Sequence, residues 1–496
     1  MKSSRILIII IALILFLVPP GCKKFLEKDP QGVLTEDQFP TSASDALLAT
    51  NAIYAQVRDW YYNSGGYPIL DIMSDDARKG SNPTDQASYV GPYDYFGITP
   101  TSDGLDRWWT SLYVGVRRAN VVIEKVPLIT MDDSLKSRYI GEAKFLRALF
   151  YFDFVRAWGG VPLVTTTDPP LGLARASKEA VYSLIISDLQ SAISSLPQKS
   201  QYATTDLGRA TKEAAEALLA RVYLFRNDFA NAEIYAMDVI NMNKYSLEPV
   251  FINVCGVNGN NGVESIFEVG ALEVENQDAG GNQYGNTQGV RGVPNKGWGF
   301  NRPSISLRNS FEAGDPRYKG TVIDLNDTID GIVILGDAQT PDVTRDAQGN
   351  IIEIQCYSRK VWVPGATTTS NWGLHRRLIR YADVLLMAAE ALNENGNPTQ
   401  ALTYLNMVRA RARQGNPNIL PDCTTTDQSQ LRDSIFNERR HELALEGFRF
   451  WDLVRTGRAP AVLGPLGFVT GKNEVLPIPQ SEIDLSQGTL VQNPNY

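Results

Sequence analysis

Cysteine is scarce in this 496-residue chain, which contains four cysteines in all. Cys22 lies close to the N-terminus, and the other three are widely separated: Cys255, Cys356 and Cys423. Three cysteines allow at most one disulfide and leave one thiol over, and their separations match no metal-binding motif. The sequence therefore predicts a fold that disulfides do not hold together.

Histidine is scarcer still, and this limits metal chemistry. The two histidines, His375 and His441, do not form a metal-spaced pair. The segment Asn326–Gly331, with Asp337 at the twelfth position, faintly resembles a calcium-binding loop. A glycine-centred turn before a short strand is the simpler interpretation. The sequence predicts no metal site and no cofactor.

The motifs of common catalytic sites are absent as well. No G-x-S-x-G, P-loop or H-E-x-x-H pattern occurs. The formal net charge is −8, and an acidic chain without a basic stripe is not expected to bind nucleic acid. Beyond the N-terminal segment, no apolar run reaches the roughly 20 residues that a transmembrane helix needs. We therefore expect a globular, non-catalytic protein.

The N-terminus has the features of an export signal. Lys2 and Arg5 give it a basic start, and Ile6–Val18 follows as an unbroken apolar run. This run is too short to span a bilayer but suits a signal peptide, which we place at residues 1–21. A glycine directly precedes Cys22, in an arrangement that resembles a bacterial lipoprotein box. We expect acyl chains such as palmitate on this cysteine; the alternative is an uncleaved anchor or an ordinary secreted protein.

Helical patterns dominate the rest of the chain. Ser42–Trp60 has apolar residues at helical spacing behind a Thr-Ser cap, which predicts an amphipathic helix. Gly141–Trp158 is apolar on nearly all sides, so we expect a central buried helix that ends at two glycines. A further helix is predicted from four residues at helical spacing: Trp109, Tyr113, Val116 and Asn120.

Two later stretches place small residues at matching positions on consecutive helices. In each stretch the pattern continues across a polar turn, and two alanines stand twelve residues apart. This spacing is typical of tetratricopeptide helical pairs, although generic helix packing explains it equally well. The residues concerned are Ala220, Tyr223, Ala232 and Ala236 in the first stretch, and Ala389, Leu392, Ala401 and Leu405 in the second.

Long irregular segments separate these helices. Residues 60–96 contain eight aromatic residues, and residues 278–300 contain seven glycines together with Tyr284, Trp298 and Phe300. Short strands are predicted nearby, at Gly331–Leu335 and at Ile351–Gln355. Loops of this length inside a compact domain are usually functional or disordered, and the aromatic content argues against disorder.

Several phrases follow one another in a fixed order along the chain: Phe25–Pro30, Gly141–Pro162, Trp298-Gly299, Gly314–Arg317, Leu378–Leu392, Asn437–Arg455, Leu476–Pro479 with Glu482-Ile483, and Gln492–Tyr496. Together these phrases resemble the SusD/RagB family of nutrient-binding outer-membrane lipoproteins. Departures are small: Gln487-Gly488 replaces Asn-Pro, and Asn495 replaces a glycine.

This resemblance implies a mainly α fold of the SusD type. Tetratricopeptide-like helical pairs would form its scaffold, with long irregular loops and a few short strands around them. We expect a lipidated tether at 22–40, an N-terminal part at 41–260 and a C-terminal part at 261–496, joined in one compact unit. The resemblance also implies attachment to the outer membrane, with the protein facing outward.

By the same resemblance, the protein captures a glycan and passes it to a SusC-like TonB-dependent transporter. Two alternatives stay open: the same role with peptides as ligand, and a glycan-processing enzyme or a scaffold without a small ligand. Sugar rings bind to exposed aromatic faces that have amides and carboxylates beside them. The candidate residues for ligand contact are Tyr89, Tyr93, Tyr95, Tyr284, Trp298 and Trp372; each has the alternative of packing beneath its own loop.

The charged residues of the phrase Asn437–Arg455 are expected to be structural. Glu446, Arg449, Asp452 and Arg455 form successive i,i+3 pairs of opposite charge. On a helix surface each pair contributes about 0.2–0.5 kcal/mol. We expect an ion-paired helical corner here.

Overall fold

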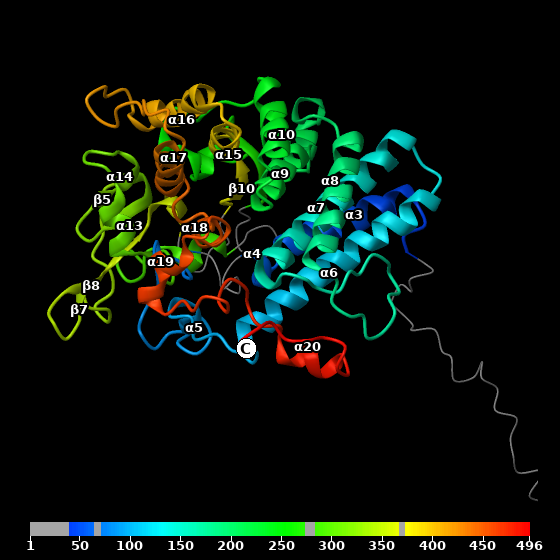
Figure 1. Ribbon diagram of the computed structural model, residues 1–496, viewed down its shortest axis with the longest axis horizontal. Helices are drawn as coiled ribbons and strands as arrows, with labels where there is room; N and C mark the ends of the chain where they lie inside the picture. The colour runs from blue at the N-terminus through cyan, green and yellow to red at the C-terminus, as the bar shows by residue number, and fades with distance from the viewer. Residues whose placement is uncertain (1–38, 64–70, 273–282, 367–372) are drawn as a thin grey trace, which may run out of the picture.

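The computed structural model describes residues 39–63, 71–272, 283–366 and 373–496 (Figure 1). The longest helices lie on one side of the molecule, and the other side combines shorter helices with strands and loops. One hydrophobic core extends through both parts, from Ala46 to Ile478. The core is therefore continuous across position 260, where we divide the chain into its N-terminal and C-terminal parts.

The N-terminal part is built from four long helices: α3 (Ala43–Val57), α6 (Asp103–Lys125), α7 (Asp133–Trp158) and α8 (Lys178–Ser195). Ser42 begins α3 with a reciprocal capping box. The Asp45 backbone N–H donates to the Ser42 hydroxyl, and the Ser42 backbone N–H donates to the Asp45 carboxylate. Gly159, at φ +72°, ends α7. These findings confirm the predicted amphipathic helix and the predicted central helix.

Aromatic side chains fill the space between α6 and α7. The Trp109 and Trp158 ring centroids are 5.1 Å apart at an interplanar angle of 88°, which is a favourable edge-to-face arrangement. Trp108 lies 4.8 Å from Trp158 by the same measure. Gly115 lets the helices approach closely, because a Cβ atom there would stand 2.4 Å from the Phe150 ring.

The predicted helical pairs are present as α9 (Lys212–Phe225) with α10 (Phe229–Asn241), and α15 (Tyr381–Glu394) with α16 (Pro398–Ala412). Their interfacial alanines are fully buried. Helix α10 also packs against α15, so the two pairs stack although they are distant in sequence. This stacking favours the tetratricopeptide-like interpretation over generic packing. Helix α17 (Gln428–Glu442) packs against both α15 and α16.

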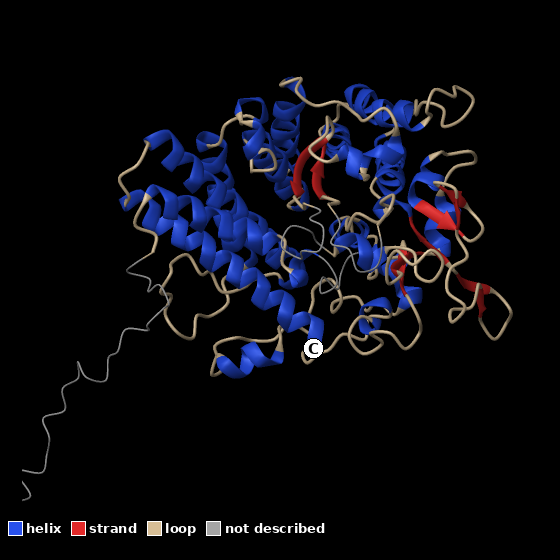
Figure 2. Cartoon of the chain, turned by 180° about the vertical axis from the view of Figure 1, so that it is seen from behind, coloured by secondary structure: helices blue, strands red, loops and turns tan. Residues whose placement is uncertain are grey.

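Within the described residues the strands form five small antiparallel sheets, scattered among loops (Figure 2). The pairs are β1 (Ala77–Gly80) with β3 (Phe300–Pro303), β2 (Ser265–Val269) with β10 (Arg376–Arg380), β4 (Val322–Asp324) with β9 (Cys356–Ser358), β5 (Thr328–Ile329) with β6 (Ile332–Val333), and β7 (Val343–Arg345) with β8 (Ile351–Ile354). The last two pairs contain the strands predicted from the sequence.

Short helices complete the fold. They are α4 (Trp60–Asn63), α5 (Gly91–Asp94), α11 (Phe251–Val254), α12 (Tyr284–Gln288), α13 (Ile305–Ser310), α14 (Arg317–Thr321), α18 (Arg449–Arg455), α19 (Ala459–Leu463) and α20 (Gln480–Leu485). No helix in the described part of the chain is long and apolar enough to cross a membrane. Cys255, Cys356 and Cys423 are free thiols.

The C-terminal part contains a network of buried charges. Arg380 donates from Nη1 to Glu264 and Glu442, at 2.6 Å each, and from Nε to Glu446 at 2.8 Å. The Arg380 side chain is 1% exposed. These partners raise the pKa of its guanidinium above the ordinary value despite the opposing effect of burial. The network ties β10 to β2 and to the end of α17.

This network corrects the predicted i,i+3 pairs. Only the Asp452–Arg455 pair forms, at 2.7 Å. Glu446 binds Arg380, and Arg449 binds Asp75 at 2.8 Å. Two of the three predicted pairs are therefore wrong as local pairs. The physical reason for the first is that α17 ends at Glu442 and Gly447 follows at φ +85°, so Glu446 and Arg449 do not share a helix. Arg449 and Asp452 do share α18, but the Arg449 guanidinium binds Asp75 instead. The prediction of a structural role agrees with the burial of these groups.

Candidate functional site

A short sheet brings the two aromatic segments of the sequence together. Strand β1 lies within residues 60–96 and pairs with β3, which directly follows the glycine-rich segment 278–300. The Ser81 backbone N–H also donates to the Gly299 carbonyl at 2.7 Å. Gly80 is required at this crossing, because a Cβ atom there would stand 2.3 Å from the Gly299 oxygen. The register therefore fixes the two segments side by side.

Two tryptophans from these segments pack against each other. The Trp60 and Trp298 ring centroids are 5.6 Å apart, with an interplanar angle of 59°. Both side chains are half-buried, so each ring keeps part of its surface toward solvent. A partly exposed aromatic pair of this kind offers a face on which the C–H groups of a sugar ring can pack.

A cavity of about 590 Å³ opens beside Trp298. Arg291 is held in its wall by Asp337, at 2.7 Å, and by Asp85. The exposed Gln339 accepts from Asn82 at 3.1 Å and from Arg291 at 3.3 Å. The lining residues are Arg291, Gly292, Val293, Asn295, Gly297, Trp298, Gly336, Asp337, Ala338 and Gln339. The cavity thus combines an aromatic edge with the exposed amides of Asn295 and Gln339, which can bind hydroxyls.

The predicted tyrosines lie in different environments. Tyr93 is fully buried, and Tyr284 is 7% exposed with the Arg376 guanidinium 5.5 Å from its ring centroid. Tyr89 is half-buried, and burial raises the pKa of its hydroxyl. Tyr95 is 59% exposed, and its ring lies over Gly97, where a Cβ atom would stand 2.3 Å away. Of these four, Tyr95 has the most solvent-exposed surface.

Two predicted site residues, Cys22 and Trp372, lie outside the described residues. The structure adds three residues that the sequence did not single out: Trp60, Asn82 and Gln339. Trp60 belongs to residues 60–96, and the high aromatic content of that segment was a usable signal. Gln339 carries no comparable signal, because its place at the cavity depends on the long-range pairing of its loop with Arg291.

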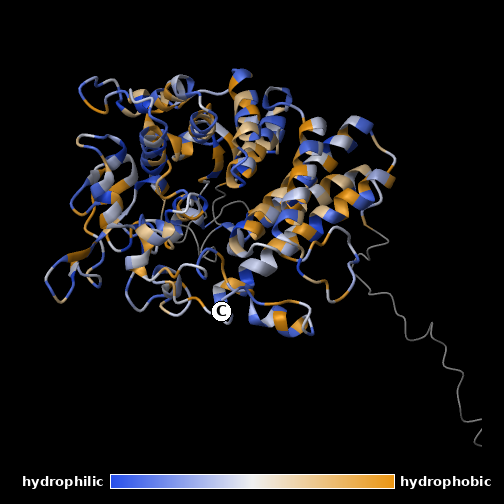
Figure 3. Ribbon diagram, in the orientation of Figure 1, coloured by the Kyte–Doolittle hydropathy of each residue, from blue (hydrophilic) through white to orange (hydrophobic). Residues whose placement is uncertain are grey.

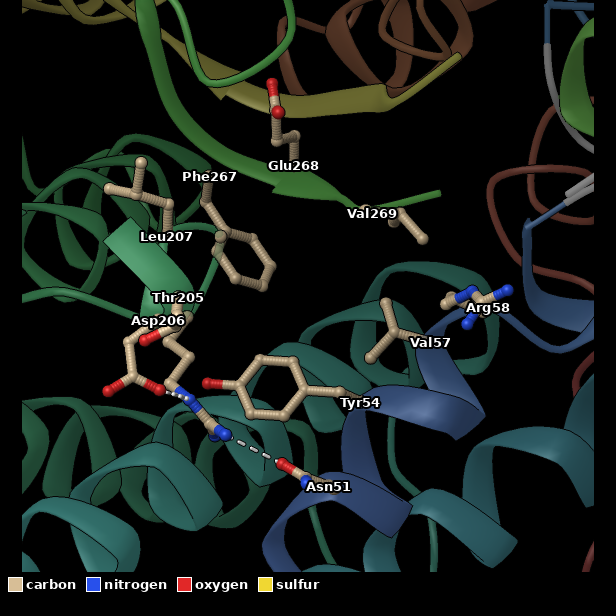
Figure 4. A pocket seen from close by; sticks show the side chains of 13 residues that line it. Asn51, Tyr54, Val57, Arg58, Thr205, Asp206, Leu207, Phe267, Glu268 and Val269 are labelled. Atoms are coloured by element: carbon tan, nitrogen blue, oxygen red, sulfur yellow. Dashed lines mark hydrogen bonds and ion pairs between the residues drawn. The ribbon is translucent and has the colours of Figure 1, made fainter. Parts of the chain in front are cut away.

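A second cavity, of about 220 Å³, lies between α3, residues 204–209 and β2 (Figure 4). Tyr54 and Phe267 supply its aromatic walls. Its polar groups are already paired, because Arg209 donates to Asn51 and to Asp206, at 2.8 Å each. We therefore interpret this cavity as part of the packing between the helices and β2.

Among the described residues, one group has the composition of a metal site: Glu312, Glu438 and His441. Arg409 donates to both carboxylates at 2.8 Å. Burial lowers the pKa of His441 to about 4. Because the guanidinium already occupies the carboxylate oxygens, the group is an ion-paired cluster rather than a cation site.

The acids of the faint calcium motif are also bonded to other groups. Asp327 accepts from Lys319 at 2.8 Å, and Asp330 accepts from the Trp362 indole at 2.7 Å. Asp337 pairs with Arg291. Asp330 and Gly331 adopt positive φ angles between β5 and β6, as a tight turn requires. The arrangement agrees with the glycine-centred turn.

Comparisons with known proteins identify the family. Residues 263–467 match the model of the SusD family, and residues 24–224 match a model described as starch-binding associating with outer membrane. A laminarin binding SusD-like protein of known structure superposes with a TM-score of 0.77 at 30% identity, covering 92% of this chain and 100% of that one. The chain belongs to the SusD/RagB family.

Two further relatives extend this similarity over nearly the whole chain. SusD-like protein P38 of Formosa agariphila is 29% identical over 505 residues, which cover 96% of each chain. Surface glycan-binding protein A from Bacteroides thetaiotaomicron, solved in complex with laminarihexaose, has a TM-score of 0.75 at 25% identity. The match covers 92% of this chain and 100% of that one.

Proposed function

We propose that this SusD/RagB protein is a non-catalytic, outward-facing lipoprotein that captures a glycan and passes it to a SusC-like TonB-dependent transporter. The observation that carries the proposal is the Trp60–Trp298 pair at a polar cavity. Two relatives are named for binding laminarin or were solved with laminarihexaose. Their names support a glycan as the ligand class and place laminarin first among the glycans to test.

The site chemistry fits weak, reversible capture. The two indoles provide apolar contact for a sugar face, while the amides of Asn295 and Gln339 lie at the adjoining cavity and can bond hydroxyls. We expect a single-site binding free energy of about 4–6 kcal/mol, equivalent to high-micromolar to millimolar affinity. Weak binding suits a protein that must release its ligand to a transporter.

Attachment through Cys22 is part of the same proposal. Seventeen positions separate Cys22 from Phe39, where the described chain begins. An extended segment of this length reaches at most about 60 Å. Acyl labelling tests the attachment: we expect label on the wild type and none on Cys22→Ala. Equal labelling of the two proteins would remove the anchor from the proposal.

Affinity electrophoresis tests the ligand class. The purified protein is run through gels that contain laminarin, starch or other polysaccharides, with a mixture of peptides assayed in parallel. We expect at least one glycan to retard the protein. Binding of peptides with no retardation by any glycan would assign the same capture role to peptides instead.

Chromatography of the incubated glycans tests the absence of catalysis. We expect the retained polysaccharide and its oligosaccharides to be recovered at their original length after prolonged incubation. Release of shorter products by the purified wild type, and not by a mock preparation, would show an enzyme and contradict the proposal.

A further inference from the structure

The charges around the cavity beside Trp298 restrict the kind of glycan that it can take. Among the described residues that line it, Arg291 is the one cation and Asp337 the one anion. The other lining residues are uncharged. Binding of a sugar that carries a carboxylate or a sulfate would therefore depend on the donors of the Arg291 guanidinium.

The surroundings of the cavity do not indicate a ligand class through hydropathy. One wall of the cavity is the segment between β6 and β7, in the strand-and-loop part of the molecule on the left of Figure 1. In the same orientation, Figure 3 shows hydrophilic and hydrophobic residues interspersed in this part. The partners of each charged group are therefore the more informative observation.

Two carboxylates already neutralise Arg291. Its Nε lies 2.7 Å from the Asp337 carboxylate, and its Nη1 donates to the Asp85 carboxylate and, at 2.7 Å, to the Ser81 hydroxyl. Its Nη2 donates to the side-chain carbonyl of Gln339 at 3.3 Å. Every nitrogen of the guanidinium thus has a partner. One cation with two carboxylates leaves this group with a net charge of −1.

Hydrogen bonds keep the two carboxylates in place. Asp337 accepts from the backbone N–H groups of Gln339 at 3.0 Å and of Thr340 at 2.6 Å. Burial opposes the ionisation of Asp85, but the hydrogen bonds from Arg291 and Ser81 lower the pKa of this carboxyl below its ordinary value. The Asp85 carboxylate therefore stays charged at neutral pH.

Two lysines near the cavity are also occupied. Lys79, on β1, donates to three backbone carbonyls of residues 80–85, at 2.9–3.0 Å. Lys296 is 4% exposed and donates to the Val363 and Ala366 carbonyls at 3.0 Å each. Lys79 offsets part of the negative charge of Asp85, but both ammonium groups are directed toward backbone carbonyls.

The internal segments outside the described residues cannot add a cation either. These segments are residues 64–70, 273–282 and 367–372, and their sequences contain neither lysine nor arginine. The cationic groups that could pair with an anionic sugar in the cavity are thus limited to the three already described.

We propose that this cavity takes an uncharged part of a glycan and discriminates against sugars that carry a carboxylate or a sulfate group. This inference rests on the proposed function and adds the class of glycan to it. An anionic substituent would lose its water and meet two carboxylates without a free cationic donor. A hydroxyl has no such cost, because the exposed amides of Asn295 and Gln339 can bond it.

Calorimetric titration compares the neutral glycan that retards the wild type with the same glycan after partial carboxymethylation. At about 0.01 M salt, the wild type should bind the carboxymethylated form about tenfold more weakly. At about 1 M salt, where charges are screened within about 3 Å, the difference should largely disappear. Equal or tighter binding of the carboxymethylated form at low salt would overturn the inference and leave glycan capture in place.

A charge-removing double variant tests the cause. Asp85→Asn with Asp337→Asn removes both carboxylate charges but keeps a side-chain carbonyl at each position. This variant should bind the two forms about equally or prefer the carboxymethylated one. Its matched control, Asp133→Asn with Glu179→Gln, removes the same charge at side chains that are 97% and 68% exposed on α7 and α8; it should keep the preference of the wild type.

The remaining outcomes are equally decisive. A preference for the neutral form that persists both in the Asp85→Asn, Asp337→Asn variant and at high salt would show a steric effect and overturn the inference. If this variant does not fold, the salt dependence of the wild type decides between charge and steric effects. Absence of retardation by every glycan would refute glycan capture itself, and the inference with it.

Discussion

The α6–α7 interface and the junction of β10 with α17 are both buried, but different forces hold them. Between α6 and α7, tryptophans and phenylalanines pack with no ionic contact among them. At the junction, Arg380 and Glu442 are buried together with several other charges. The stability of the first interface depends on how closely its side chains fill the available volume. The stability of the second depends on each buried charge keeping a partner of opposite sign.

The largest expected effect comes from removing one member of the charge network. Arg380→Met should lower the free energy of unfolding by about 3–5 kcal/mol, because three carboxylates lose a buried cation. Urea unfolding at pH 7 measures the change. Arg458→Met is the control, because Arg458 and Asp433 are 30% and 58% exposed and their pair is worth about 1 kcal/mol or less. Equal losses in both variants would refute the distinction.

The second prediction concerns a buried carboxyl that has no cation of its own. Burial, with Asp76 nearby, raises the pKa of Asp71 to about 7 from 3.8. The folded state therefore binds more protons than the unfolded state between these values, and stability falls as pH rises from about 4 to 7. Asp71→Asn should remove this loss and stabilise the protein at pH 8 by roughly 2–4 kcal/mol.

Asparagine is a suitable replacement because its carbonyl can still accept from the Gly447 N–H, which lies 3.1 Å from the Asp71 carboxylate. Thermal or urea unfolding from pH 4 to 8 gives the profile. The two proteins should converge in stability near pH 4. A constant difference at every pH would mean that the carboxyl does not titrate as described.

The third prediction concerns the apolar interface between α6 and α7, where a small increase in side-chain volume is introduced. Gly115→Ala should cost about 1–3 kcal/mol, because its methyl group meets the Phe150 ring. The loss should be the same at pH 5 and pH 8, unlike that of the charged junction. Gly464→Ala serves as control, since nothing lies within 4 Å of its Cβ position and its φ is −51°. An unchanged free energy of unfolding in Gly115→Ala would show that α6 and α7 can move apart at little cost.

The smallest effect is expected at Tyr93, whose hydroxyl is buried and has no hydrogen-bond partner among the described residues. Tyr93→Phe removes that hydroxyl and should leave stability unchanged or raise it by about 1 kcal/mol. Urea unfolding measures this change as well. A decrease in the free energy of unfolding by more than about 1 kcal/mol would show that the Tyr93 hydroxyl has a hydrogen-bond partner after all.

The sequence predicted most of the helical scaffold, because helical periodicity and end signals are local. Ser42 and Gly159 mark helix ends through contacts within a few residues. Glu446 shows the limit: its sequence spacing predicted Arg449 as partner, but folding places Arg380 and Lys360 against it. Long-range partners of charged groups cannot be read from local spacing.

The candidate site, like the fold, could be predicted only in part from the sequence. Composition located the aromatic segments and included Trp298 among the candidates. The contact with Trp60 depends on the register of β1 and β3, which joins residues more than two hundred positions apart. Tyr93 and Tyr284 were chosen by residue type, and their burial follows from packing that one sequence does not display.

Calorimetric titration with the glycan that retards the wild type tests the central claim most directly. Trp298→Ala should weaken binding by about 1–2 kcal/mol, or roughly tenfold. The matched control is Tyr235→Ala, which removes a half-buried aromatic ring stacked 5.7 Å from Tyr223 on the helical scaffold; its affinity should equal that of the wild type. Unchanged affinity in Trp298→Ala, with the fold intact, would contradict glycan capture at the tryptophan pair.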